Sequence, residues 1–168
     1  MIDIVQATTP QEIDAVRDLM RAFVAWHRQR HSEDIALIDR YFDAREFEAE
    51  LAALPGKYAP PAGRLLLARK DDQAAGCVAL RDLGDGVCEM KRMFVPPRLH
   101  GQGIGCALAE RILSEAKAAG YDRMRLDTSI RQVEAIHLYE NAGFVRIAPY
   151  YQLPDELKDW LVFMELRL

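Results

Sequence analysis

The chain has 168 residues, half of them hydrophobic, and a formal net charge of −4 at pH 7. This acidic balance argues against a nucleic-acid partner, and no apolar run approaches the roughly 18 to 20 residues that span a membrane. The three cysteines form no close pair, which excludes a disulfide framework or a zinc pattern and indicates reduced thiols. We therefore expect a single cytoplasmic domain over residues 1–168, with no bound metal.

The N-terminal part of the chain predicts one strand and two helices, over residues 2–7, 10–30 and 44–54. Thr8 or Thr9 has the residue type of an N-cap for the first helix, and Glu12 completes the pattern of a capping box. The segment 31–43 between the two helices is polar and mixed, and we predict no regular element there.

The rest of the chain predicts strands first and then helices and strands in turn. Three strands with short antiparallel connections are expected over residues 64–69, 75–80 and 87–95. A helix over 106–119 with Gly120 just past its end follows. The remaining elements are a strand, a short helix and two strands, over 123–128, 133–141, 144–147 and 161–168. This order predicts a mixed α/β sheet with helices on its faces.

Residues 100–105 read His-Gly-Gln-Gly-Ile-Gly and lie between a predicted strand and a predicted helix. Glycine lets the backbone approach a ligand closely because it has no Cβ. The unpaired amides and the dipole of the first helical turn then favour a negative charge. The sequence therefore predicts a site for the phosphate or pyrophosphate of a nucleotide-like cofactor.

A dinucleotide fingerprint is one interpretation of this loop. Gly101, Gly103 and Cys106 would fill the three fingerprint positions, and Asp127 would bind the ribose. Cys106 is larger than the Gly or Ala expected there, and the loop comes late in the chain, so this interpretation is disfavoured. A P-loop is excluded because no Gly-Lys-Ser/Thr follows.

Three blocks of sequence occur in order: residues 89–95 (Glu-Met-Lys-Arg-Met-Phe-Val), the loop 100–105, and residues 135–144 (Ala-Ile-His-Leu-Tyr-Glu-Asn-Ala-Gly-Phe). This combination resembles the GNAT superfamily of N-acetyltransferases, in particular a bacterial branch whose substrates are mostly unassigned. The resemblance implies a mixed, mainly antiparallel central sheet flanked by helices on both faces. It also implies an acetyl-CoA-binding core over about residues 64–148 and acceptor-side helices over about residues 10–54.

The residues that the resemblance implies for acetyl-CoA binding are Met93, Phe94, Val95, His100, Gly101, Gln102, Gly103, Ile104, Gly105, Cys106 and Asn141. The backbone of the first three would pair with the pantetheine arm, and the loop amides would hold the pyrophosphate. His100 stands where the family has Arg or Gln, so Arg98 or Gln102 would have to compensate. Asn141 has an alternative role as a helix C-cap, and Cys106 one as a small packing residue.

Two residues are implied for catalysis. Glu89 matches the position of a general base in some family members; alternatively it is an exposed strand carboxylate paired with Lys91 or Arg125. Tyr139 matches a tyrosine that protonates the sulfur of CoA in many relatives; alternatively it packs on a helix face. His137, on the same predicted helix, is a reserve candidate for the base.

The acceptor site is expected between the first two helices and the C-terminal strands. Candidate residues for its wall are Trp26, His27, Tyr41, Phe42, Tyr150 and Tyr151. Four acids that could attract a cationic amine are Glu33, Asp34, Asp39 and Asp43. The alternative for this region is a solvated loop with aromatic anchors.

The resulting hypothesis is an acetyl-CoA-dependent N-acetyltransferase that acts directly on a primary amine of a small molecule or peptide. A non-catalytic acyl-CoA-binding module is the second hypothesis, and a dinucleotide-binding oxidoreductase domain is the third. The sequence does not name the acceptor and leaves the oligomeric state open. Because dimers are common among relatives, a homodimer is one expectation.

Overall fold

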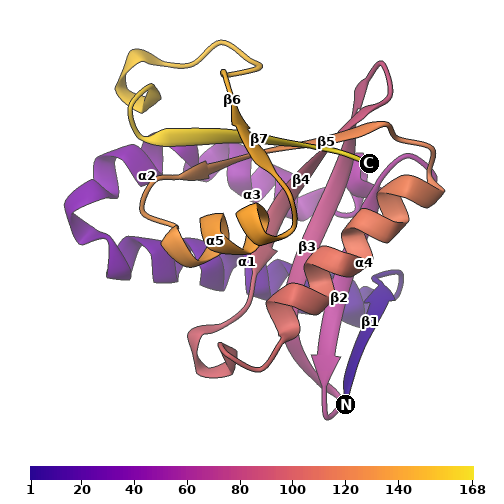
Figure 1. The fold of residues 1–168 in the computed structure, drawn as a ribbon. Coiled ribbons are helices and arrows are strands. Elements are labelled where there is room, and N and C mark those ends of the chain that lie inside the picture. Colours follow the sequence, from indigo (N-terminus) through magenta and orange to yellow (C-terminus); the bar gives the residue numbers. More distant parts are fainter.

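The computed structural model describes residues 1–168 and contains seven strands and five α-helices (Figure 1). The strands are β1 (Ile2–Gln6), β2 (Arg64–Lys70), β3 (Gln73–Gly84), β4 (Val87–Phe94), β5 (Arg123–Ser129), β6 (Val145–Ile147) and β7 (Leu161–Arg167). The helices are α1 (Pro10–Arg30), α2 (Ile35–Tyr41), α3 (Ala44–Ala52), α4 (Ile104–Ala118) and α5 (Val133–Asn141).

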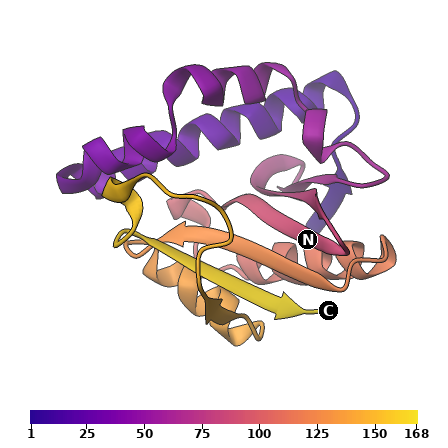
Figure 2. The same cartoon turned by 90° about the horizontal axis from the view of Figure 1, so that it is seen from above.

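All seven strands form one sheet in the order β1-β2-β3-β4-β5-β7-β6. Every neighbouring pair is antiparallel except β4 and β5, which run parallel. Figure 2 shows the helices α1, α2 and α3 covering one face of the sheet and α4 and α5 lying on the other. The predicted fold class, a mainly antiparallel mixed sheet between two helical layers, is confirmed.

Local signals placed most elements correctly. The Thr9 hydroxyl accepts from the Glu12 amide at 3.2 Å and the Glu12 carboxylate accepts from the Thr9 amide at 3.0 Å, so the capping box of α1 is confirmed. Gly120 has a φ of 90° just past α4, as expected of a residue that ends a helix. The helix α4 begins at Ile104, two residues before its predicted start, because Gly103 is its N-cap.

The helix α2 lies where the sequence predicts no regular element, so that expectation was wrong. It has only seven residues, and such a short helix is unstable alone in water. Its residue Ile38 is fully buried in the core between the sheet and α1. Tertiary packing therefore stabilises α2, and a polar, mixed sequence window does not reveal that packing.

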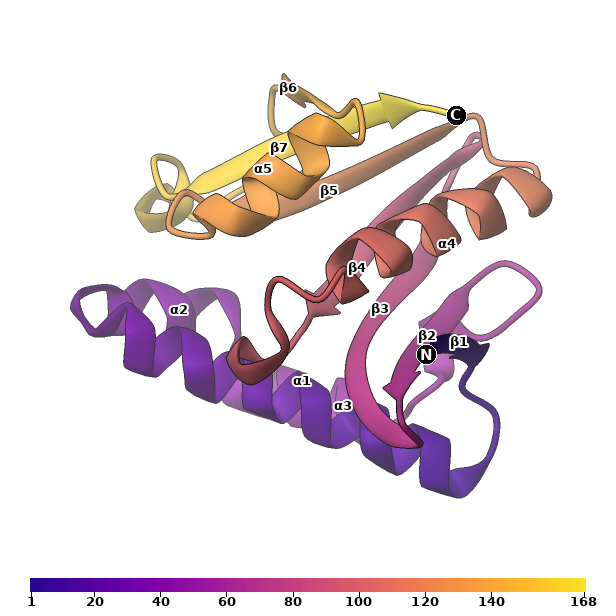
Figure 3. The same cartoon turned by 60° about the horizontal axis from the view of Figure 1, so that its bottom comes forward.

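The sheet opens between β4 and β5. These strands pair at only three positions, and the last pair is Glu89 with Arg125. Beyond it, each strand continues without the other as partner, and Figure 3 shows them diverging, with α1 crossing the wide end of the gap. A bulge bends β4 in this stretch, since the β3–β4 register shifts there and Arg92 has a φ of 60°.

Side chains alternate between two hydrophobic cores, one on each face of the sheet. Cys88 and Met90 of β4 belong to the core that packs against α4 and α5. Glu89 and Lys91 point to the opposite face, which α1, α2 and α3 cover. The gap between β4 and β5 thus connects two different environments. No helix in the structure has both the length and the apolar character that crossing a membrane requires.

Candidate active site

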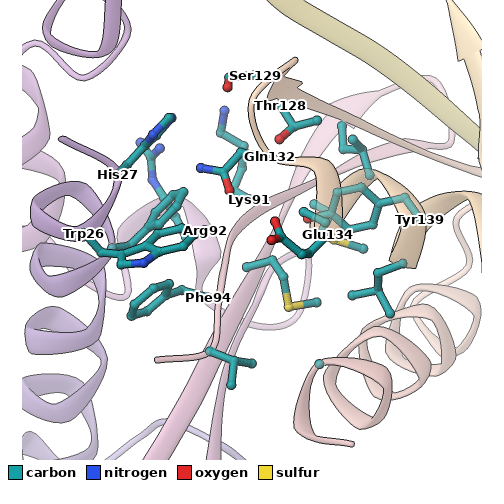
Figure 4. Close-up of a pocket in the computed structure, with 18 of the residues that line it drawn as sticks. Trp26, His27, Lys91, Arg92, Phe94, Thr128, Ser129, Gln132, Glu134 and Tyr139 are labelled. Atoms are coloured by element: carbon teal, nitrogen blue, oxygen red, sulfur yellow. The ribbon is translucent and has the colours of Figure 1, made fainter. Parts of the chain in front are cut away.

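A cavity of about 380 Å³ lies where β4 and β5 diverge (Figure 4). Its lining comes from β4, the glycine-rich loop, the N-terminus of α4, β5, α5 and the helices α1 and α2. Helices from both faces of the sheet therefore contribute to one cavity. This arrangement allows two ligands to enter from opposite faces and meet inside the sheet.

The glycine-rich loop and the start of α4 form an open candidate anion site at one end of this cavity. Gly101 and Gly103 have φ values of 75° and 80°, in the left-handed region that glycine favours. A Cβ atom built at either position would meet nothing within 4 Å, so the space beside the loop is open. No side chain caps α4, and its first intrahelical bond joins the Ala107 amide to the Gly103 carbonyl. The preceding amides are therefore available to a phosphate group.

His100 does not extend over the helix start. Its Nε2 lies 2.7 Å from the carbonyl oxygen of Val95, and its ring packs edge-on against Trp26. Gln102 instead accepts a hydrogen bond from Lys70, the last residue of β2. Lys70 is thus a cation beside the loop that the sequence did not indicate. It is 32 residues away in the chain, and no local pattern links it to the loop.

Most residues predicted for acetyl-CoA binding meet at this cavity. Those in its lining are Met93, Phe94, Val95, His100, Gly101, Gly103, Ile104, Gly105 and Cys106. Gln102 is exposed on the loop, and Asn141 is exposed as the last residue of α5; neither lines the cavity. Their contact with a cofactor stays a prediction.

Tyr139 lies on α5 and lines the cavity (Figure 4). Only 6% of its surface is exposed, and it packs against Phe144. Burial, together with the negative charge of Asp127, raises the pKa of Tyr139 above its usual range. Its phenol therefore remains protonated near neutral pH and can donate a proton.

Glu89 is 1% exposed, so the expectation of an exposed strand carboxylate was wrong. Of its two predicted partners, Lys91 forms only a long ion pair with it, at 3.9 Å, and Arg125 pairs with Glu165 instead. Glu89 accepts a hydrogen bond from Arg81 at 2.8 Å and another from the Tyr150 hydroxyl.

Glu89 therefore lies at the last position where β4 pairs with β5, and its hydrogen-bond partners Arg81 and Tyr150 come from other elements. It does not line the main cavity. It borders a second, more polar cavity of about 360 Å³ on the face covered by α2 and α3.

Lys91 and Asp127 face each other across the gap, with the nitrogen of Lys91 3.5 Å from an oxygen of Asp127. The carboxylate accepts hydrogen bonds from the hydroxyls of Tyr41 and Tyr151. Burial alone would raise the pKa of Asp127, but the charge of Lys91 and these hydrogen bonds outweigh it and lower the pKa. Both residues border both cavities, so they lie at the boundary between the two.

Sequence reasoning missed this pair. It considered Asp127 only for a dinucleotide and Lys91 only as a partner of Glu89. Lys91 is two residues after Glu89 in one strand, and Asp127 is two residues after Arg125 in the parallel neighbour. The alternation of side chains along paired strands could have indicated that they share a face.

Aromatic rings form the wall of the cavity on the α1 side. His27 stacks between Phe23 and Trp160, at centroid distances of 6.0 and 5.8 Å. Burial, helped by the charge of His31, lowers the pKa of His27 to about 4. The ring is therefore neutral at physiological pH. Trp26 also lines the cavity, as the sequence predicted for the acceptor side.

The four acids expected to attract a cationic amine already have partners in the chain. The pairs are Glu33 and Asp34 with Arg131, Asp39 with Arg28, and Asp43 with the amide of Glu46. Three of the four charges are therefore paired with arginines, whereas Asp43 caps α3 and has no cationic partner. Five of the six residues predicted for the acceptor wall line one or both cavities, whereas Tyr150 lines neither and donates a hydrogen bond to Glu89.

Comparison with known proteins agrees with this geometry. The sequence profile of the Acetyltransferase (GNAT) family matches residues 20–144. An uncharacterized N-acetyltransferase of Schizosaccharomyces pombe is 34% identical over 155 residues, covering 91% of this chain and 88% of that protein. The chain therefore belongs to the GNAT family and is an N-acetyltransferase.

Solved structures share the fold at low sequence identity. A GNAT-family acetyltransferase of Staphylococcus aureus superposes with a TM-score of 0.76 at 20% identity, over 99% of both chains. The PaiA N-acetyltransferase of Thermoplasma acidophilum, solved in complex with coenzyme A, gives a TM-score of 0.72 at 16% identity. That alignment covers 100% of this chain and 99% of the other. Enzymes of this family use an acyl-CoA donor.

Proposed function

We propose that the protein transfers an acetyl group from acetyl-CoA directly to a primary amine of a small molecule or peptide. The observation that carries this proposal is the cavity in the sheet, which has an open anion site at one end and a protonated phenol beside it. In this proposal residues 1–168 act as a single domain. The segment 64–148 binds the cofactor, and helices within 10–54 receive the acceptor.

The backbone amides at the start of α4 bind the pyrophosphate, and the pantetheine arm passes between β4 and β5. The residues proposed for these contacts are those expected from the sequence: Met93, Phe94, Val95, the loop 100–105, Cys106 and Asn141. Val95 bears on the pairing because its carbonyl oxygen already lies close to His100. A pantetheine amide that pairs with this carbonyl displaces the imidazole.

In the reaction, the amine nitrogen attacks the thioester carbon, and the carbon–sulfur bond breaks. Tyr139 donates its phenolic proton to the departing sulfur, which its burial and its place in the cavity support. Glu89 takes the proton of the amine by way of the Tyr150 hydroxyl, which donates a hydrogen bond to the Glu89 carboxylate. Water restores both protonation states after product release.

The test combines binding and turnover. Calorimetric titration with acetyl-CoA is expected to give saturable heat, whereas NAD gives none. With a panel of amino acids, polyamines, aminoglycosides and peptides, thiol release from acetyl-CoA is expected to depend on the amine. Absence of heat with acetyl-CoA contradicts the proposal. Binding without amine-dependent thiol release indicates an acyl-CoA-binding module instead.

The role of Glu89 is tested by the change Glu89→Gln, which removes the base but keeps the shape of the side chain. We expect kcat to fall by about 10²-fold or more, as for loss of a general base. The matched control is Glu140→Gln on the exposed face of α5, where the same chemical change is expected to leave kcat unaltered. Equal kcat values for Glu89→Gln and the wild type would exclude Glu89 as the base.

A further inference from the structure

The acceptor end of the main cavity has hydrogen-bond donors that the protein itself does not use fully. The ammonium group of Lys91 carries three N–H donors, and it makes one hydrogen bond, to the Tyr41 hydroxyl at 3.0 Å. Its two neighbouring carboxylates, Asp127 and Glu89, lie 3.5 and 3.9 Å away. Charge-assisted hydrogen bonds are shorter, at about 2.7 to 2.9 Å. Lys91 can therefore donate to a ligand.

Gln132 is a second unused donor in the same wall. It is the N-cap residue of α5, its side chain lines the cavity, and only 6% of its surface is exposed. Its side-chain amide nitrogen, Nε2, is buried without any hydrogen-bond partner in the chain. An unpaired buried donor is costly, and native proteins rarely keep one without a reason. Figure 4 shows Gln132 and Lys91 in the space between α1 and α5.

These donors belong to one continuous part of the wall. Ser129 lies opposite Leu161 in the sheet. Its carbonyl oxygen accepts a hydrogen bond from the backbone N–H of Gln132. The adjacent Trp160 stacks on His27 and lies 6.4 Å from the ring of Tyr41, the residue that Lys91 contacts. Gln132, His27 and Lys91 thus surround the same end of the cavity.

The carboxylates of the cavity, in contrast, are already paired. Two of them line it, Asp127 and Glu134. Asp127 accepts from two tyrosines, and Glu134 is bound by both terminal nitrogens of Arg30. Both oxygens of Asp127 already accept a hydrogen bond and Lys91 is its neighbouring cation, so a second positive charge on an acceptor would compete with Lys91. A negative charge, in contrast, would find N–H donors on Lys91 and Gln132.

The remaining wall of the cavity is apolar and consists largely of aromatic rings. Phe23, Trp26, Phe94 and Trp160 line the cavity beside the neutral ring of His27. The cavity of about 380 Å³ must also hold the thioester end of the cofactor. The space left for the acceptor suits a small molecule with an apolar or planar body rather than a folded protein.

Resting on the proposed acetyl transfer, we propose that the acceptor is a small amino carboxylate with an apolar side chain. Its carboxylate accepts hydrogen bonds from Lys91 and Gln132, and its amine faces the thioester. In an α-amino acid one carbon separates the two groups, so recognition of the carboxylate also positions the amine. The aromatic wall receives the side chain. Lys91 and Gln132 then act as specificity-determining residues that discriminate against amines without an acidic group.

The test compares acceptors that differ only in the acidic group. L-phenylalanine is compared with L-phenylalaninamide and phenethylamine, and L-leucine with L-leucinamide and 3-methylbutylamine; putrescine represents a second cation. We expect kcat/KM to be at least tenfold higher for one or both acids than for the matched amines that lack the carboxylate. The amides make this test stringent because their amines lose a proton more easily than those of the acids.

The outcomes separate this proposal from the more general one. Faster acetylation of putrescine or of the amines without a carboxylate than of the acids overturns the proposal of an amino carboxylate acceptor. Acetyl transfer itself is preserved by that outcome. Acetyl-CoA binding without acetylation of any of these amines, or of the wider panel of amines, overturns both. Thiol release only with acceptors outside the set, such as aminoglycosides or peptides, also overturns the amino carboxylate.

The change Gln132→Glu adds a negative charge at nearly constant shape and should repel a carboxylate. We expect KM for the preferred acid to rise at least tenfold, and the ratio of kcat/KM for this acid to kcat/KM for phenethylamine to fall at least tenfold. Gln73→Glu, at the exposed first residue of β3, is the matched control and should alter neither. An equal loss of kcat/KM for the acid and for phenethylamine would show a structural role and overturn the assignment of Gln132.

Discussion

The cofactor side and the acceptor side of the cavity are built in different ways. The proposed cofactor side comes from residues 93–106, a short continuous stretch that ends one strand and begins one helix, and we propose that its free backbone amides bind the cofactor. The acceptor side consists of side chains from distant segments. The hydrogen bond between Tyr41 and Asp127, for example, joins residues 86 positions apart.

This difference decides what each side demands of the sequence. A site made of backbone amides requires glycine where φ is positive and a helix start in the right place, and few other side chains matter. A site made of side chains depends on the whole fold, because each group is oriented by partners from other elements. We therefore expect substitutions to act locally on the cofactor side and through buried networks on the acceptor side.

The largest effect on stability is expected from Arg92→Leu on the acceptor side. Arg92 donates to both oxygens of Glu50, at 2.9 and 3.2 Å, and lies over the rings of Phe42 and Phe47. Its loss leaves a largely buried carboxylate with only Lys57 as partner, which should cost about 3 kcal/mol of unfolding free energy. Urea denaturation measures this change.

Two controls accompany that measurement. The double change Arg92→Leu with Glu50→Leu should recover part of the loss, because no unpaired charge remains. Arg21→Leu removes a comparable bidentate pair with Glu48 at the surface and should change stability little. Equal losses for Arg21→Leu and Arg92→Leu would refute a special role for burial on the acceptor side.

The next effect is catalytic and lies at the junction of the two sides. Tyr139→Phe removes the phenolic proton while keeping the ring that packs against Phe144. We expect kcat to fall by about 100-fold, in the range for loss of a general acid, with unchanged affinity for acetyl-CoA. Steady-state kinetics and calorimetry measure the two quantities. Tyr121→Phe, whose hydroxyl donates to the Ala62 carbonyl, is the control; an unaltered kcat in Tyr139→Phe would remove this tyrosine from the mechanism.

A smaller effect concerns pH and the buried ring of His27. Its pKa of about 4 in the folded state lies below the ordinary value near 6.5, so the unfolded chain takes up the proton first as pH falls. Stability is therefore complete above about pH 6.5 and decreases below it, by about 2 kcal/mol at pH 5.

Thermal or urea denaturation at pH 7 and pH 5 measures this dependence, with His27→Phe as the comparison. The variant should lose less stability between the two pH values than the wild type. Some dependence should remain, because burial and the charge of Arg30 lower the pKa of His31 as well. Identical pH dependence in the two proteins would show that His27 titrates normally in the folded state.

The smallest effect is expected on the cofactor side. Gly103→Ala forces a side chain into a φ of 80° although no atom would crowd it, and should cost about 1 kcal/mol of stability. Gly105→Ala is the matched control, because Gly105 lies within α4 and an added Cβ would meet Leu138 only at 3.6 Å. It should be neutral or stabilising. A larger loss in Gly105→Ala than in Gly103→Ala would contradict the assigned loop conformation.

Much of the fold was predictable because its signals are local. The capping box at Thr9 and Glu12 and the glycine after α4 act within a few residues, and the structure follows them. The loop 100–105 was predictable for the same reason, since one short segment contains both the glycines and the helix start. The helix α2 was not, because its stability depends on the buried contacts of Ile38.

The sequence by itself determined the order of the elements other than α2, the glycine-rich loop at the start of α4 and the family resemblance, all of which depend on neighbouring residues. Only the tertiary structure decided that Glu89 pairs with Arg81, that Lys70 reaches the glycine-rich loop, and that Lys91 faces Asp127. The physical reason is that strand pairing and helix packing bring these charges together across long stretches of chain. The balance of paired and unpaired groups that we propose selects the acceptor arises from such contacts.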